Sequence, residues 1–207
     1  MTAPADATRL AELAQPEGPA AWTRILIHTR QTVLPKRLFE PGPDAAQLTE
    51  LFEAAAAAPD HDQRLPWRFI VVPVDKRVLL AEAFAQALLE RDPAALPAQL
   101  AQAREKAHRA PLLMLALARL DPTDTDVTAP ERWVSLGCAI QNMLLTAHAM
   151  GFGSALTSGQ AITSPRLAAL FGLGALEVPV CFVNVGTAGH SKPMRPRPDP
   201  QRFVSSL

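Results

Sequence analysis

Polar side chains suited to binding gather in residues 58–69, a turn segment that runs directly into the β-branched run at residues 70–72. Loops held at the edge of a rigid sheet often carry binding residues. This segment contains His61, whose imidazole can donate a hydrogen bond or move a proton near neutral pH. No Ser or Cys stands in a Gly-x-Ser-x-Gly nucleophile context, so a catalytic triad is not expected. We interpret His61 as a candidate binding residue, with a structural hydrogen-bonding role as the alternative.

A second group, the triplet Arg30, Gln31 and Thr32, has the chemistry of anion binding. A guanidinium offers a bidentate fork to a phosphate, and a hydroxyl adds another donor. An arginine at a helix end can instead interact with the helix dipole. Residues 192–199 form a basic, proline-stiffened tail that includes Arg195. Such a tail is either a solvated terminus or a pre-ordered anion contact.

Residues 151–159 are rich in Gly, Ser and Thr and include Leu156, Thr157 and Ser158. Small residues can bring backbone N–H and C=O groups close to a flat ligand. The segment lacks the Gly-Lys-Ser/Thr ending of a phosphate-binding loop and the glycine spacing of a dinucleotide fingerprint. It is therefore either a ligand-contacting segment or a plain connection from a helix to a strand.

These segments need an ordered framework, and the hydrophobic pattern predicts one. The continuous apolar run at residues 111–117 predicts a central strand covered on both faces. Residues 130–150 form a helix that is apolar over most of its girth, which places it in the middle of the structure. Helices outnumber strands, so the fold class is α+β. We expect an N-terminal arm over residues 1–20 and one domain over residues 21–207. The pattern also predicts helices over residues 22–29, 44–58, 75–90, 93–109 and 164–171, and strands over residues 68–72 and 178–185.

Composition excludes several classes of protein. The 207 residues are 48% hydrophobic, with 20 basic and 20 acidic side chains, which favours a globular protein and gives no sign of nucleic-acid binding. No apolar run reaches the roughly 20 residues of a membrane span, and no secretory signal pattern is present. Cys138 and Cys181 are expected to be reduced thiols, with a disulfide or a metal pair as the alternatives, and no zinc-site spacing occurs. We therefore expect a cytoplasmic protein without a metal site.

Taken in order, the segments resemble those of the nitroreductase family, the flavin-dependent NAD(P)H oxidoreductases, and especially its small, compact members. The resemblance covers residues 22–204 and implies an α+β sheet flanked by helices with non-covalently bound FMN. It also implies an intertwined homodimer with two identical active sites at the interface, in which the C-terminal segment reaches the partner. The residues that carry the resemblance are 30–38, 58–69, 137–151 and Gly186-Thr187 followed by Arg195.

The resemblance implies one phosphate site that is built from residues near both ends of the chain. The family's phosphate-binding Arg-Arg-Ser corresponds to Arg30, Gln31 and Thr32. Arg195 matches the basic residue that joins this site from the C-terminal segment. Gln31 replaces the middle arginine, so one cationic phosphate contact of the family is missing here.

The resemblance also assigns ring contacts. His61 matches the loop position that reaches the flavin from the other subunit, and Leu156, Thr157 and Ser158 match the segment along the isoalloxazine ring. Ala57 stands where the compact members have a basic residue, four positions before the histidine, so that contact is absent.

The implied activity is transfer of a hydride from NAD(P)H, the co-substrate, to FMN and then to a nitroaromatic, quinone or similar small acceptor in a ping-pong cycle. Solvent can supply the protons, so no residue is assigned as a catalytic acid or base. Lys36 is a candidate for stabilising the reduced flavin. The first alternative is a flavin-holding or flavin-processing module on the same fold without general reductase activity. The second alternative is an α+β dimer that is not an enzyme.

Overall fold

The computed structural model describes residues 18–189 and 196–207. Short 3-10 helices join several of the main elements: η1 (Pro35–Arg37), η2 (His61–Gln63), η3 (Val74–Lys76), η4 (Lys106–His108), η5 (Gln160–Thr163) and η6 (Pro200–Arg202). The α-helices are α2 (Pro19–Thr29), α3 (Ala45–Ala56), α4 (Arg77–Arg91), α5 (Pro97–Glu105), α6 (Ala129–Ala149) and α7 (Pro165–Phe171). The strands are β1 (Leu38–Phe39), β2 (Trp67–Val71), β3 (Leu112–Arg119), β4 (Phe152–Thr157) and β5 (Glu177–Ala188).

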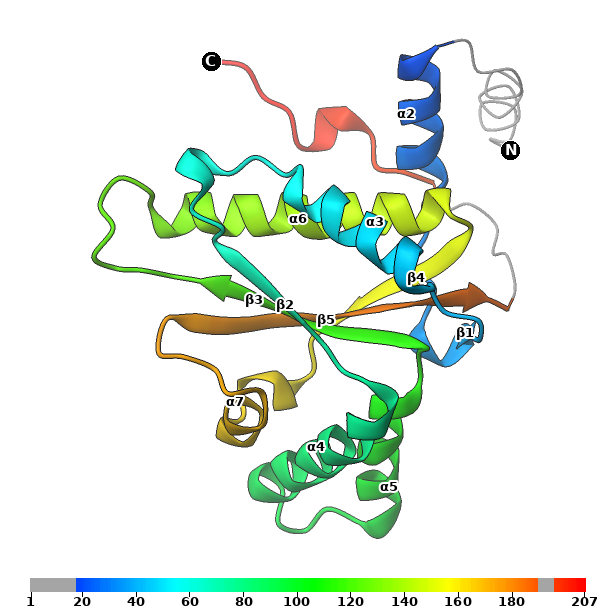
Figure 1. The fold of residues 1–207 in the computed structure, drawn as a ribbon, viewed down its shortest axis with the longest axis vertical. Helices are drawn as coiled ribbons and strands as arrows, with labels where there is room; N and C mark the ends of the chain where they lie inside the picture. Colours follow the sequence, from blue (N-terminus) through cyan, green and yellow to red (C-terminus); the bar gives the residue numbers. More distant parts are fainter. Residues whose placement is uncertain (1–17, 190–195) are drawn as a thin grey trace.

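One antiparallel sheet separates two layers of helices (Figure 1). Its strands follow the order β1-β5-β3-β2, and β4 also pairs with β5. Helices α3 and α6 cover one face, and α4, α5 and α7 lie on the other (Figure 1). The predicted α+β class, a sheet flanked by helices, is therefore confirmed.

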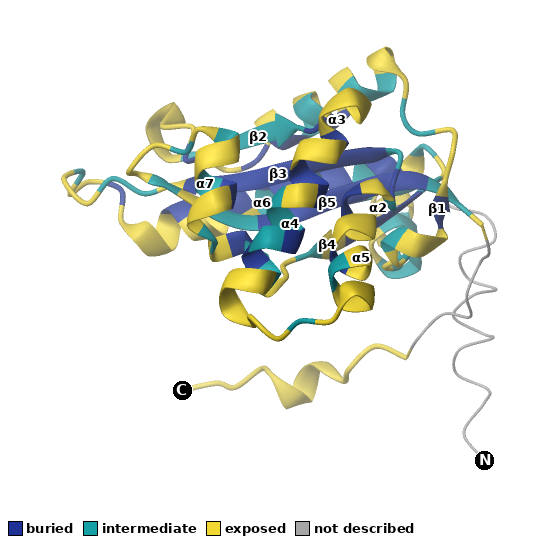
Figure 2. Ribbon diagram, turned by 90° about the horizontal axis from the view of Figure 1, so that it is seen from below, coloured by how far each residue is buried: buried dark blue, intermediate teal, exposed yellow. Residues whose placement is uncertain are grey.

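Strand β3 explains how one apolar run supports both layers. Met114 and Ala116 belong to the cluster that packs on α3 and α6, whereas Leu113, Leu115 and Leu117 belong to the cluster on the opposite face. Side chains alternate between the two faces of a strand, so a strand covered on both sides must be apolar at every position. In Figure 2 the buried strands β3 and β5 lie between exposed helix surfaces. The predicted central strand is confirmed.

Helix α6 lies on the face of the sheet, with its inner side buried. Its inner residues include Leu136, Ile140 and Met143, and Asn142 ties it to α3 by donating a hydrogen bond to the carbonyl of Ala54 at 3.0 Å. The outer side carries Val134, which is 65% exposed. The expectation that this helix lies in the middle of the structure is therefore only partly met: the sheet, α3 and α2 pack against it, but its outer side is exposed in the single chain.

Residues 152–157 form strand β4, whereas the sequence suggested a ligand-contacting segment or a plain connection. Its register pairs Gly153 with Gly186 and Thr157 with Phe182. A Cβ on Gly153 would come within 2.9 Å of Leu38 and 3.0 Å of Val33, so the close approach of neighbouring chain segments requires glycine there. Glycine is depleted in strands, and this is why the pattern did not predict one.

A buried guanidinium joins α4 to the chain leading into β3. Arg77 is 3% exposed and donates to the carbonyls of Val72 (2.9 Å), Ala107 (2.7 Å), Ala110 (3.1 Å) and Pro111 (3.0 Å). Those carbonyls belong to the ends of β2 and η4 and to the start of β3, where regular pairing stops. Arg77 therefore fixes the α4–α5 layer against the sheet.

Two further expectations concern membrane-spanning helices and the state of the two cysteines. Within residues 18–189 and 196–207, no helix is both long and apolar enough to cross a bilayer. Both cysteines are free thiols, and burial raises the pKa of Cys181 to about 11, which keeps its thiol protonated and unreactive at neutral pH.

Candidate functional site

Two arginines from opposite ends of the chain, Arg30 and Arg197, lie close together at the C-terminus of α2. Nη2 of Arg197 donates to the carbonyl oxygens of Arg30 at 2.9 Å and His28 at 3.2 Å. Burial lowers the pKa of Arg30, and the positive charge of Arg197 lowers it further. Among the described residues, no carboxylate forms an ion pair with either arginine. Two adjacent cations without a counter-ion make a strong site for an anion such as a phosphate.

The basic C-terminal segment supplies Arg197 to this group, whereas the predicted contact of Arg195 stays a prediction. Arg195, the predicted C-terminal contact, lies outside the described residues, and Arg197 is the arginine placed beside Arg30. The basic tail was the sequence signal for both. Proline alternates with arginine in this tail, so spacing alone could not show that Arg197 turns toward α2.

The rest of the predicted triplet leads away from this anion site along strand β4. Gln31 is half-buried, and Thr32 forms an isolated parallel bridge with Ser154. The N–H of Val33 donates to the carbonyl of Ser154 at 2.9 Å. The extended chain therefore connects Arg30 with Leu34 over at most about 14 Å.

His148, at the end of α6, ties that helix to α2 beside Arg30. Its Nε2 lies 2.8 Å from Oγ1 of Thr29, and that hydroxyl donates to the carbonyl of Ile25 at 2.7 Å. The hydroxyl therefore accepts from Nε2–H, which fixes the tautomer of the neutral ring. Burial lowers the pKa of His148, and the charge of Arg30 lowers it further.

This lowered pKa predicts a loss of stability in acid. The unfolded chain titrates His148 at about 6.5, above its folded value, so the unfolded state binds more protons below that pH. We expect the free energy of unfolding to fall as pH drops below about 6.5. The variant His148→Gln, which keeps a donor for Thr29, should lose part of this dependence. Thermal melting of both proteins between pH 7.5 and 5.5 measures it, and parallel curves would contradict the assignment.

A cavity of about 720 Å³ lies between the α4–α5 layer and the end of β4. This volume falls within the roughly 300–1,000 Å³ of sites that enclose small molecules. Phe182 and Leu113 of the sheet give it an apolar floor, and Lys36 of η1 lies at its side. The remaining lining residues are Leu34, Pro35, Phe84, Leu88, Arg91, Gln99, Gln102, Ala103, Lys106, Arg109, Thr157, Ser158, Gly159, Gln160, Ala161, Ile162 and Asn184.

Two of the three predicted ring contacts line this cavity. Thr157 and Ser158 do so, whereas Leu156, 43% exposed, is not among the lining residues because side chains alternate along β4. Asn184, which the sequence analysis missed, is buried in the lining and donates to Oγ1 of Thr157 at 3.1 Å. A single amide in the apolar strand over residues 178–185 was the signal that could have indicated it.

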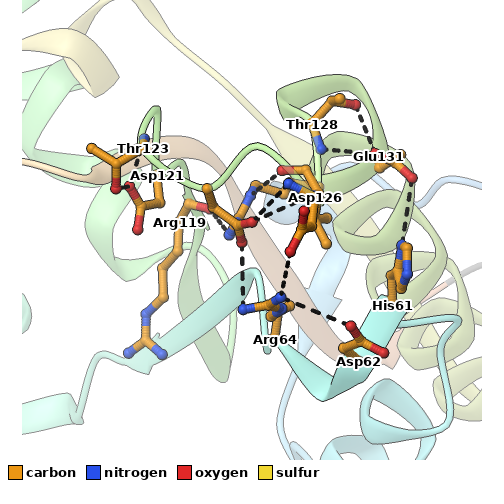
Figure 3. Close-up of polar contacts among 12 residues, drawn as sticks. His61, Asp62, Arg64, Arg119, Asp121, Thr123, Asp126, Thr128 and Glu131 are labelled. Carbon is orange, nitrogen blue, oxygen red and sulfur yellow. Dashed lines mark hydrogen bonds and ion pairs between the residues drawn. The ribbon is translucent and has the colours of Figure 1, made fainter.

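His61 lies at the other end of α6. Its Nδ1 is 3.6 Å from Oε1 of Glu131, in the first turn of that helix (Figure 3). His148, beside Arg30, lies in the last turn, so the helical rise separates the two ends by about 25 Å. Within one chain, His61 and Arg30 therefore cannot contact the same end of a small ligand.

The loop that carries His61 has an unusual backbone. Asp62, Gln63 and Leu65 all have φ between 47° and 54°, a left-handed conformation that costs free energy for residues other than glycine. Arg64 lies between three carboxylates at 3.7–3.8 Å (Figure 3). Within the described ranges, the buried Oδ1 of Asp60 has no hydrogen-bond partner. The loop therefore combines a backbone conformation that costs free energy with one buried carboxylate oxygen that lacks a hydrogen bond within the described residues.

The arrangement has the groups to hold an elongated anionic ligand. The paired arginines can bind an anionic end, and the cavity can enclose a flat apolar ring. Across residues 18–189 and 196–207, no cluster of His, Cys, Asp and Glu could hold a metal ion.

Comparisons with known proteins give concordant matches. The family described as "Nitroreductase family" matches residues 36–187. A Haemophilus influenzae protein named "Putative NAD(P)H nitroreductase" is 35% identical over 152 residues, which are 73% of this chain and 82% of that protein.

Two solved structures share the fold. A nitroreductase-like family protein from Bacillus cereus matches with a TM-score of 0.78 at 19% identity, over 94% of this chain and 99% of that one. A variant of the FMN and NADPH-dependent nitroreductase NfnB from sphigopyxis sp. strain HMH matches with a TM-score of 0.70 at 17% identity, over 88% of this chain and 97% of that one.

Proposed function

Because the chain belongs to the nitroreductase family, we propose that it is an FMN-dependent oxidoreductase. Its reaction would transfer a hydride from NAD(P)H to a nitroaromatic, quinone or similar small acceptor. Bound FMN would supply the redox chemistry by receiving the hydride and delivering it in a ping-pong cycle. The observation that carries the proposal is the pair of arginines, Arg30 and Arg197, which form no ion pair with a described carboxylate. The extended segment after Arg30 leads to Leu34, which lines a cavity of ring size.

The residues present fit the two ends of FMN. Arg30 and Arg197 would bind the phosphate by charge and bidentate hydrogen bonds. The segment from Thr32 to Leu34, running along β4, gives the ribityl chain a path of at most about 14 Å from Arg30 to the cavity. Thr157, held by Asn184, lies where the ring would sit.

The polar groups around the ring would orient it and tune its charge. Lys36, which lines the cavity, would stabilise negative charge on the reduced ring. The apolar floor excludes water from one face of the ring. Protons for the acceptor would come from solvent, so the chain needs no dedicated acid or base.

We propose further that the active site is completed by a second copy of the chain. The distance of about 25 Å along α6 keeps His61 away from Arg30 of its own chain. The outer face of α6 carries Trp133, 39% exposed, and Val134, 65% exposed, which a partner would cover. A two-fold dimer would bring His61 of one chain to the flavin bound at Arg30 of the other.

Hybrid dimers provide a test of this sharing. Chains carrying Arg30→Ala or His61→Ala should each form impaired homodimers. Co-expressed with different affinity tags and purified through both, the hybrid should regain roughly half of the wild-type flavin and turnover, because one of its two sites keeps both residues. A hybrid of Arg30→Ala with Arg30→Ala/His61→Ala, which has no intact site, is the control. If the test hybrid is no better than this control, the two residues do not serve a shared site.

The proposed function has a direct test. Purified protein supplied with FMN should show a flavin absorbance spectrum that bleaches on anaerobic addition of NADPH or NADH. Addition of a nitroaromatic or a quinone should restore the colour and support steady oxidation of the nicotinamide. A protein that bleaches but never turns over would be a flavin-holding module. A colourless protein that takes up no FMN would contradict the proposal.

A further inference from the structure

The cavity beside β4 carries a charge bias that the chain as a whole lacks. The sequence has 20 basic and 20 acidic residues. Among the described residues, the cavity lining nevertheless includes Lys36, Arg91, Lys106 and Arg109, and no Asp or Glu. A concave, one-signed surface concentrates ligands of the opposite charge.

Most of these cations form no ion pair with another described residue. Arg109 pairs with Glu105 at 3.3 Å. Lys36, Arg91 and Lys106 form no ion pair with any residue in the described parts of the chain. Arg91 in the last turn of α4 also complements the helix dipole, but that role does not require it to face a cavity.

The wall of the cavity opposite β4, formed by the end of α4 with α5 and η4, carries several polar side chains close together. Gln99, Gln102 and Lys106 are separated by three and four residues, a spacing that puts them on one side of α5 and η4. All three line the cavity, together with Arg91 from the end of α4. Amide donors beside two cations form a site for a carboxylate or a phosphate.

We propose that this wall selects a substrate that carries an anionic group, a carboxylate or a phosphate, at a distance from its reacting atom. Arg91 and Lys106 bind that group, and Gln99 and Gln102 add hydrogen bonds. The inference rests on the proposed function in that β4 and Lys36 hold the ring. The anion is either a carboxylate on the electron acceptor or the 2′-phosphate that distinguishes NADPH from NADH.

The test measures binding in matched pairs of ligands that differ in one anionic group. Isothermal titration calorimetry on the full-length, FMN-supplemented protein compares 4-nitrobenzoate with 4-nitrobenzamide, and adenosine 2′-phosphate with adenosine. We expect the anionic member of at least one pair to bind about tenfold more tightly, the combined effect of two partly exposed cations. A preference in the benzoate pair identifies the acceptor as the source of the anion, and a preference in the adenosine pair identifies the nicotinamide cofactor.

Matched variants separate this wall from general electrostatics. Arg91→Gln/Lys106→Gln should abolish the preference. Arg24→Gln/Lys76→Gln, which removes the same charges from exposed positions outside the cavity lining, should keep it. Equal binding of both members of both pairs, or a preference that survives in Arg91→Gln/Lys106→Gln, overturns the inference.

The outcome is distinguishable from failure of the proposed function. Calorimetry reports anion binding whether or not the protein turns over. A protein that takes up FMN and oxidises NAD(P)H but shows no anion preference would overturn this inference and leave the proposed function intact. The opposite result is a protein that binds no flavin but prefers the anionic ligand, and loses this preference in Arg91→Gln/Lys106→Gln. That result would support anion binding by this wall and contradict the proposed function.

Discussion

Replacing Arg30 with alanine is expected to weaken FMN binding about 10- to 100-fold, so that the protein is purified largely without flavin. Arg30 would supply a charge-assisted hydrogen bond to the phosphate, and such bonds contribute roughly 1.5–3 kcal/mol. The expected loss is larger because Arg197 lies beside Arg30 and forms no ion pair with a described residue. A bound phosphate would neutralise both positive charges, so the two arginines and the phosphate stabilise one another. The flavin-to-protein ratio after gel filtration, and titration of the apoprotein with FMN, measure the loss.

Three companion variants make the result specific. Arg24 lies exposed on the same helix, so Arg24→Ala should bind FMN as the wild type does. Arg197→Ala should lose affinity to a similar degree. The double variant should lose less than the sum of the two, because both guanidiniums act on one phosphate. Stoichiometric, tightly held flavin in Arg30→Ala would show that the phosphate lies elsewhere.

Replacing Arg77 with methionine is expected to lower the free energy of unfolding by about 3 kcal/mol or more. Methionine can fill the space of the aliphatic stem but cannot donate to the four carbonyls that the guanidinium now satisfies. Each buried carbonyl left without a donor costs roughly 1–3 kcal/mol unless water reaches it. For a chain of this size, the change corresponds to a fall in melting temperature of roughly 6–12 °C.

Denaturant unfolding at neutral pH measures this effect, and Arg104→Met is the matched control. Arg104 forms an exposed ion pair with Glu82 at 2.9 Å in the same layer of helices. Exposed pairs contribute about 1 kcal/mol or less, so this variant should be nearly as stable as the wild type. Equal losses in Arg77→Met and Arg104→Met would show that the buried hydrogen bonds do not anchor the layer.

Features governed by neighbouring residues could be predicted from the sequence. Asp44 and Gln47 form the expected capping box at the start of α3, because both partners lie within one helical turn. Gly151 has the left-handed φ of 86° expected for a residue that ends a helix. Strand β3 is buried from Leu112 to Ala118, as a continuous apolar run requires, and only its last residue, Arg119, is exposed.

Features that depend on contacts between distant segments could not be predicted from spacing. Strand β4 exists because its backbone pairs with β5, and its small residues give little intrinsic preference for a strand. The single helix expected over residues 93–109 is shorter, with α5 starting at Pro97. The division into an N-terminal arm and a single domain stays a prediction, since residues 1–17 lie outside the described part of the chain.

The candidate site residues also divide into features that local sequence predicts and features that depend on long-range contacts. The sequence alone determined the family and the α+β class, because those depend on residue types and on local periodicity. It also indicated the segments of the proposed site, and that assignment stays a prediction. Only the tertiary structure decided that Arg197 lies beside Arg30 and that Thr157 and Ser158 line a cavity with Arg91 and Lys106. The tertiary structure likewise placed His61 at the far end of α6 from Arg30. The physical reason is that these relations join residues far apart in the chain, and the packing of helices on the sheet, rather than local spacing, sets their distances.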